Sequence, residues 1–78
     1  MLPKDLTGKE LIKLLRQFGY EVVRQSGSHI RIQTDEKGRH SETIPNHNPL
    51  KLGTLKQILK NIAAHLEISL EKLEKRLF

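Results

Sequence analysis

The 78-residue sequence has no cysteine and no tryptophan, and it contains one tyrosine and two phenylalanines. Because cysteine is absent, the chain can form neither a disulfide nor a thiolate metal site, and its composition is typical of a reducing compartment. It also lacks an apolar run long enough to span a membrane, and its first residues lack the apolar core of a signal peptide. We therefore expect a cytoplasmic protein with an aliphatic core and no membrane partner.

Acidic residues are outnumbered as well. Lysine and arginine total 14 against 9 aspartates and glutamates, which gives a formal net charge of +5. A cationic surplus on so short a chain favours a polyanionic partner, since phosphates attract it without sequence specificity. A nucleic acid fits this balance, and so does an acidic protein partner.

The first half of the sequence predicts one helix followed by three strands. Residues 7–10 (TGKE) match a capping box, and apolar residues then recur at helical spacing until Gly19, a helix stop. Segments rich in β-forming residues follow over 20–25, 30–34 and 39–44. Because only short turns separate these segments, they indicate an antiparallel meander.

The second half predicts two further helices. Two prolines within residues 45–49 end the third strand and forbid a helix there. An apolar stripe then runs from about Gly53 and Thr54 to residue 66, and Ser69 is a favoured N-cap for a short helix over 69–77. Each longer helix has one apolar stripe, so both must cover the same sheet face and leave the other open to water.

Length and element order together predict a single α+β domain over residues 1–78, with a core of about 7–66. The expected architecture is α-β-β-β-α: a three-stranded antiparallel sheet with helices on one face and a short extra C-terminal helix.

The most informative stretch is residues 26–33, where a Ser-Gly-Ser turn leads directly into the second strand. Alternation turns Ile30 and Ile32 toward the helices and leaves three polar side chains on the open face: His29, Arg31 and Gln33. An imidazole, a guanidinium and an amide in a row suit a phosphodiester better than a core. The alternative interpretation is a surface histidine beside an ordinary hairpin turn.

Several segments, in this order and at this spacing, resemble the HicA toxin family: residues 7–10, 18–25, 27–29, 44–47 and 53–60. The resemblance covers about residues 7–69. It implies a fold like the double-stranded RNA-binding domain, ribosome-independent cleavage of mRNA, no metal or cofactor, and a cognate HicB-type antitoxin. The family's catalytic histidine falls on His29, and Gly27 and Ser28 match the residues before it that let the backbone approach the substrate.

Histidine suits metal-free RNA cleavage, because its unperturbed pKa lies near neutrality and it can take the proton of a 2′-OH. We assign His29 as general base or general acid. His47 is the candidate for protonating the leaving 5′-oxygen, with the alternative that it satisfies backbone groups of its own loop. His40 and His65 are expected to be bystanders on a strand surface and a helix surface. No spacing supports a metal site built from these histidines.

Phosphate contacts are expected from Arg31 and from two lysines that flank the start of the second long helix, Lys51 and Lys56, with Arg24 as a further candidate. Plain solvation of the lysines is the alternative. Scarce aromatics predict weak sequence preference. Two other functions stay open: a non-catalytic RNA-binding module of the same fold, and a basic protein-binding domain.

The sequence departs from the family's usual pattern in two places. Residues 61–67 extend the helix without the glycine that commonly breaks it, which leaves the placement of the C-terminal helix open. Ile30 stands where some members carry a second histidine, which gives His47 more weight if two acid–base groups are needed.

Overall fold

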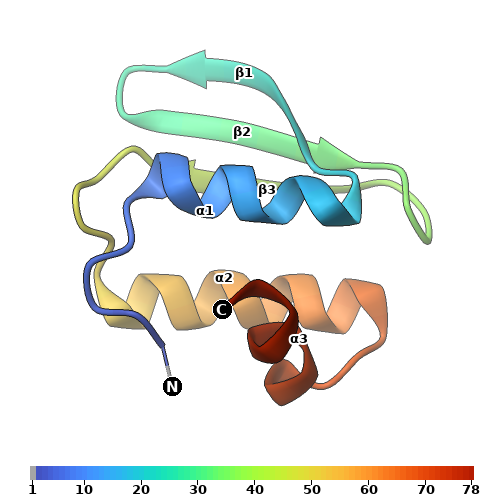
Figure 1. Cartoon of the computed structure of the whole chain (residues 1–78). Helices are drawn as coiled ribbons and strands as arrows, with labels where there is room; N and C mark the ends of the chain where they lie inside the picture. The colour runs from blue at the N-terminus through green and yellow to red at the C-terminus, as the bar shows by residue number, and fades with distance from the viewer. Residues whose placement is uncertain (1) are drawn as a thin grey trace.

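A computed structural model describes residues 2–78 and confirms the expected α+β architecture (Figure 1). In chain order the elements are α1 (Gly8–Leu15), a 3₁₀ turn (Arg16–Phe18), β1 (Glu21–Ser26), β2 (His29–Thr34), β3 (His40–Pro45), α2 (Leu52–Leu66) and α3 (Leu70–Leu77).

The first helix begins as its sequence predicts and ends slightly earlier. The Thr7 hydroxyl accepts the Glu10 N–H at 3.1 Å, and the Glu10 carboxylate accepts the Thr7 N–H at 2.9 Å, which completes the capping box. The helix tightens into the 3₁₀ turn after Leu15, and Gly19 ends it at φ 81°. A side chain on Gly19 would also meet Thr34 and Glu36, so only glycine fits there.

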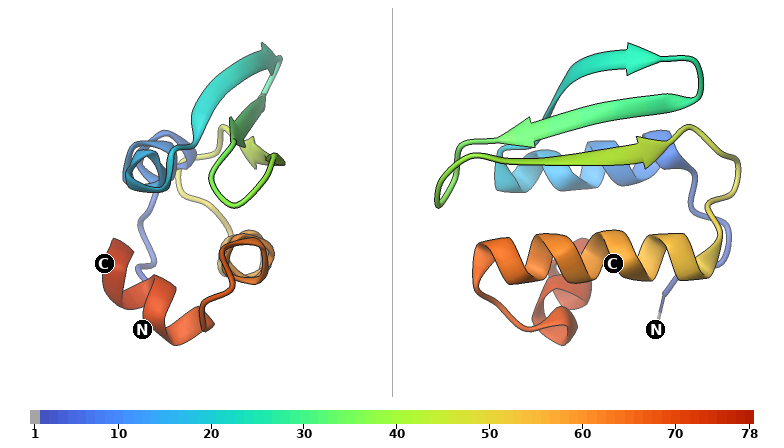
Figure 2. Two further views of the ribbon diagram at one scale, coloured as in Figure 1. Left: turned by 90° about the vertical axis from the view of Figure 1, so that its right-hand side faces the viewer. Right: turned by 180° about the vertical axis from the view of Figure 1, so that it is seen from behind.

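The sheet is antiparallel in the order β1-β2-β3, and α1 and α2 lie on one of its faces (Figures 1 and 2). Ile30 and Ile32 of β2 and Ile44 of β3 are buried against α1 and α2. The intervening side chains point to the uncovered face, as the alternation predicts. We call this uncovered surface the open face.

The outer strand β1 contributes no buried residue to this core, because all six of its residues are exposed. Val22 and Val23 keep 44% and 53% of their surface. The strand begins one residue later than predicted, and Tyr20, which precedes it, is fully buried instead. The edge of the sheet therefore extends beyond the cover of the helices.

The structure also settles where the C-terminal helix lies. α2 ends at Leu66, and Glu67 adopts φ 60° in place of the usual glycine, with the Ile68 N–H bonded to the Ala63 carbonyl. Ser69 then caps α3, which packs on the side of the helices away from the sheet (Figure 2). No helix among residues 2–78 is long and apolar enough to cross a membrane.

Candidate functional site

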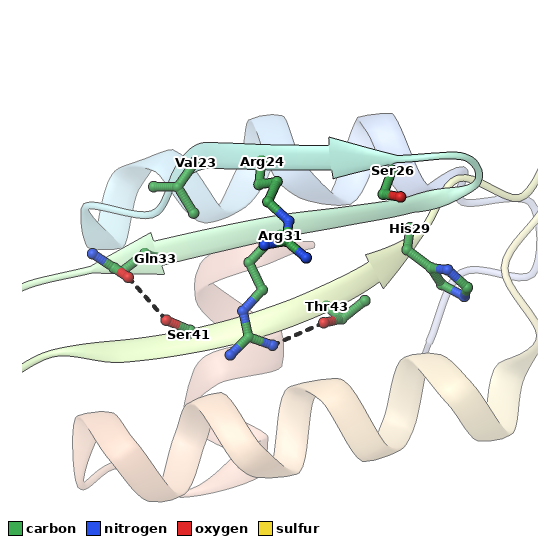
Figure 3. A pocket seen from close by; sticks show the side chains of 8 residues that line it. All are labelled: Val23, Arg24, Ser26, His29, Arg31, Gln33, Ser41 and Thr43. Atoms are coloured by element: carbon green, nitrogen blue, oxygen red, sulfur yellow. Dashed lines mark hydrogen bonds between the residues drawn. The ribbon is translucent and has the colours of Figure 1, made fainter.

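A hollow of about 550 Å³ lies on the open face (Figure 3). Its lining comes from all three strands: Val23, Arg24, Ser26, His29, Arg31, Gln33, Ser41 and Thr43. This lining contains two arginines and one histidine and no acidic side chain. The hollow therefore presents a cationic, hydrogen-bonding surface that suits an anion.

A tight turn places His29 at the end of this hollow. Ser26 pairs with His29 across a two-residue turn in which Gly27 has φ 58°, the conformation that favours glycine at the first central position. A Cβ on Gly27 would touch nothing within 4 Å, so the turn requires glycine for its backbone angle and not for space. The Ser28 carbonyl accepts the Asn46 N–H at 2.7 Å, which ties the turn to the loop after β3.

A bulge in β1 brings a second arginine onto the open face. Val22 pairs with Ile32, but the next pair is Arg24 with Arg31, so Val23 is the extra residue. Without the bulge, alternation from Val22 would turn Arg24 toward the helices. Two arginines directly opposite each other repel, which costs stability unless an anion lies between them.

The side chains of the hollow differ in how firmly they are held. The Arg31 guanidinium donates to the Thr43 hydroxyl at 3.0 Å, and the Ser41 hydroxyl donates to the Gln33 side-chain carbonyl at 3.1 Å (Figure 3). The His29 ring is exposed and makes no hydrogen bond or ion pair with any of residues 2–78. A positioned guanidinium and an exposed imidazole in one hollow are groups that can bind a phosphate and move a proton.

His47, the second predicted acid–base residue, lies in the loop next to this hollow but does not line it. Its side chain is exposed, and its main-chain carbonyl accepts the Gly8 N–H at 3.0 Å. A Cβ on Gly8 would overlap the Pro45 carbonyl oxygen, so α1 packs directly against this loop. The loop after β3 is therefore held by the β1–β2 turn on one side and by the start of α1 on the other.

The two predicted lysines also lie outside the hollow. Lys51 is the exposed N-cap residue of α2, and Lys56 lines a separate surface hollow with Lys4 and Leu52. Arg24, by contrast, lies in the hollow itself, and only the bulge reveals that position.

His40 and His65 were expected to be bystanders on a strand surface and a helix surface. Both are instead partly buried and in contact with each other on the helix side of the sheet, so the surface placement was wrong. Their rings stack at 4.6 Å between centroids, and the Tyr20 hydroxyl lies 2.7 Å from His40 Nδ1. We call Tyr20, His40 and His65 the histidine cluster.

The histidine cluster is partly buried and holds elements of the fold together. Burial is the main cause that lowers the pKa of His40 and raises the pKa of Tyr20. His65 Nε2 lies 2.8 Å and 3.0 Å from the carbonyl oxygens of Glu36 and Gly38, so it fastens α2 to the β2–β3 turn. No group of three or more potential metal ligands occurs within residues 2–78.

Comparison with models of known protein families matches residues 8–63 to the family described as HicA toxin of bacterial toxin-antitoxin. The match covers well over half of the chain and includes α1, the whole sheet and most of α2. No curated protein and no solved structure matches the chain.

Proposed function

The chain belongs to the HicA toxin family, and we propose that it is an endoribonuclease that cleaves mRNA without a metal ion. Family membership supports the role of toxin in a toxin–antitoxin pair. The observation that carries the proposed activity is the His29 ring, without a partner among residues 2–78, in the same hollow as Arg24 and Arg31 and with no acidic lining residue.

The proposed reaction uses the RNA's own 2′-OH. His29 removes the 2′-OH proton, the 2′-oxygen bonds to the adjacent phosphorus, and the bond from phosphorus to the 5′-oxygen breaks. The products are a 2′,3′-cyclic phosphate and a 5′-OH, whose proton comes from His47 or from water. In the reverse assignment, His29 acts as the general acid and protonates the leaving 5′-oxygen. Arg24 and Arg31 stabilise the charge that builds on the phosphate.

The remaining predicted residues act around this centre. Gly27 and Ser28 form the turn that presents His29, and Lys51 and Lys56 are proposed to contact phosphates further along the strand. The proposed protein partner is a HicB-type antitoxin that covers His29 and the open face with acidic or polar groups near Arg31.

The test is incubation of the purified chain with a long single-stranded mRNA in EDTA, beside an identically prepared His29→Ala protein. We expect the native chain to cut the RNA and the variant to cut about 10²–10⁴ times more slowly, since one acid–base group contributes about that factor. Thermal unfolding of the variant should be unchanged, because the exposed His29 ring has no partner among residues 2–78. Equal cleavage by both proteins would contradict the assignment.

A non-catalytic RNA-binding module is the second candidate, and one observation favours it. His47 does not line the hollow, so His29 is the only acid–base side chain there. This candidate predicts RNA binding that weakens steeply with salt, and no cleavage in EDTA by either protein. A basic protein-binding domain predicts neither cleavage nor salt-dependent RNA binding.

A further inference from the structure

A second groove adjoins the cationic hollow at the β3 edge of the sheet, opposite β1. It has a volume of about 540 Å³ and lies between β3 and α2. Arg31 and Thr43 line both spaces, so the two spaces lie next to each other at this pair of side chains. The groove has a different chemistry, because its lining includes one carboxylate and two side-chain amides: Glu42, Gln57 and Asn61.

These three side chains form a hydrogen-bonded chain with a fixed direction. Asn61 Nδ2 donates to the Glu42 carboxylate at 2.8 Å, and Gln57 Nε2 donates to Asn61 Oδ1 at 3.0 Å. A carboxylate can only accept, so the Asn61 amide must turn its nitrogen toward Glu42 and its oxygen toward Gln57. Gln57 must therefore turn its amide nitrogen toward Asn61, which leaves its carbonyl oxygen without this partner.

This direction leaves two acceptor oxygens of the groove lining without a donor among residues 2–78. They are the Gln57 side-chain carbonyl and the second Glu42 oxygen. Like charge keeps a phosphate away from the Glu42 carboxylate, so the sugar–phosphate backbone belongs on the Arg31 side. What fits the Glu42 side is a neutral group that donates hydrogen bonds.

We propose that this groove binds a nucleobase next to the scissile phosphate and selects bases that carry an exocyclic amino group over uracil. Adenine, cytosine and guanine present an exocyclic amino group to an acceptor such as Glu42. The corresponding donor of uracil is its ring N3–H, which lies between two carbonyl oxygens that repel a carboxylate. The inference rests on the proposed RNA substrate and adds a preference that scarce aromatic residues do not provide. It makes Glu42 and Gln57 specificity-determining residues.

The test measures binding and not cleavage. The native chain is titrated at low salt into fluorescent 2′-O-methyl hexanucleotides of A, C or U, which offer no free 2′-OH for cleavage. We expect the A and C oligomers to bind about five- to tenfold more tightly than the U oligomer, the discrimination typical of a side-chain contact to a base edge. In Glu42→Gln the ratio should fall to about one.

Glu71→Gln is the matched control, because it removes the same charge from an exposed position on α3, away from the groove, and should leave the ratio intact. If Glu42→Gln unfolds, Gln57→Leu removes the other acceptor and should also lower the ratio. Equal binding of all three oligomers, or a ratio that survives Glu42→Gln in a folded protein, would overturn the proposal. Base preference without any cleavage of mRNA would support the groove and refute the nuclease.

Discussion

His29 and His40 occupy the same position in neighbouring strands, because each is the first residue of its strand, yet their surroundings differ completely. His29 lies exposed on the open face without a partner among residues 2–78. His40 lies on the helix side, with the Tyr20 hydroxyl at 2.7 Å and the His65 ring stacked at 4.6 Å. The ring of His29 is exposed to solvent, whereas the ring of His40 joins elements of the fold.

The parity of the nearest buried residue explains the difference. Ile30 directly follows His29, so the two side chains point to opposite faces, whereas Ile44 lies four positions after His40 and shares its face. Histidine is therefore a candidate for chemistry on the open face and a structural residue in the histidine cluster. The predictions below test this division, beginning with the largest effect.

Arg24→Gln should weaken RNA binding about fivefold at low salt and reduce the salt dependence by about one phosphate contact. It should also leave the free energy of unfolding unchanged or raise it by a few tenths of a kcal/mol (about 0.2–0.5), because it relieves the repulsion with the paired Arg31. Filter binding across a salt series and urea unfolding measure the two effects.

Arg39→Gln is the control for this substitution. Arg39 is exposed near the β2–β3 turn and pairs with Asp35 at 3.2 Å, away from the hollow, so its loss should change RNA binding less. If Arg39→Gln weakened binding as much as Arg24→Gln, net charge and not the open face would govern RNA binding.

Alternation and capping predicted most of the fold, because they depend on local pattern. The capping box, the Gly19 stop, the faces of β2 and the Ser69 cap all follow from residues a few positions apart. The same local pattern predicted that His29 and Arg31 share one face.

Features that depend on contacts between distant elements did not follow from the sequence. The bulge that turns Arg24 outward depends on how β1 pairs with β2. The stacking of His40 on His65 joins β3 to α2, although the parity of Ile44 already indicated the inward side for His40. The Glu42–Asn61–Gln57 chain likewise joins two elements, so no local pattern signals the second groove.

Glu67→Gly, at the end of α2 next to the histidine cluster, should raise the free energy of unfolding without changing the open face. Glu67 holds φ 60° after α2, a conformation that costs a non-glycine residue about 1 kcal/mol. Its ion pair with Lys37 is 3.7 Å long and largely exposed, so its loss subtracts little. We expect unfolding to cost about 1 kcal/mol more and RNA cleavage to stay the same. Lys60→Gly inside α2 is the opposite control, with a loss of about 1 kcal/mol.

The smallest effect is a pH dependence of stability that belongs to His40. Its pKa lies below the ordinary 6.5, chiefly because burial disfavours the charged ring; His65 and Arg31 lower it further, and Glu42 opposes them. On acidification the unfolded chain therefore takes up this proton first, so stability is complete above about pH 6.5 and falls as the pH drops toward the native pKa.

Urea unfolding between about pH 7.5 and about pH 5 should show this slope, at less than the roughly 1.4 kcal/mol per pH unit of one whole proton. His40→Gln should flatten the slope, and His29→Gln shows how much of any change comes from the loss of a histidine as such. If the two variants flattened it equally, the slope would not belong to the histidine cluster. If only His40→Gln flattens the slope, the covered histidine couples protonation to folding and the exposed His29 does not.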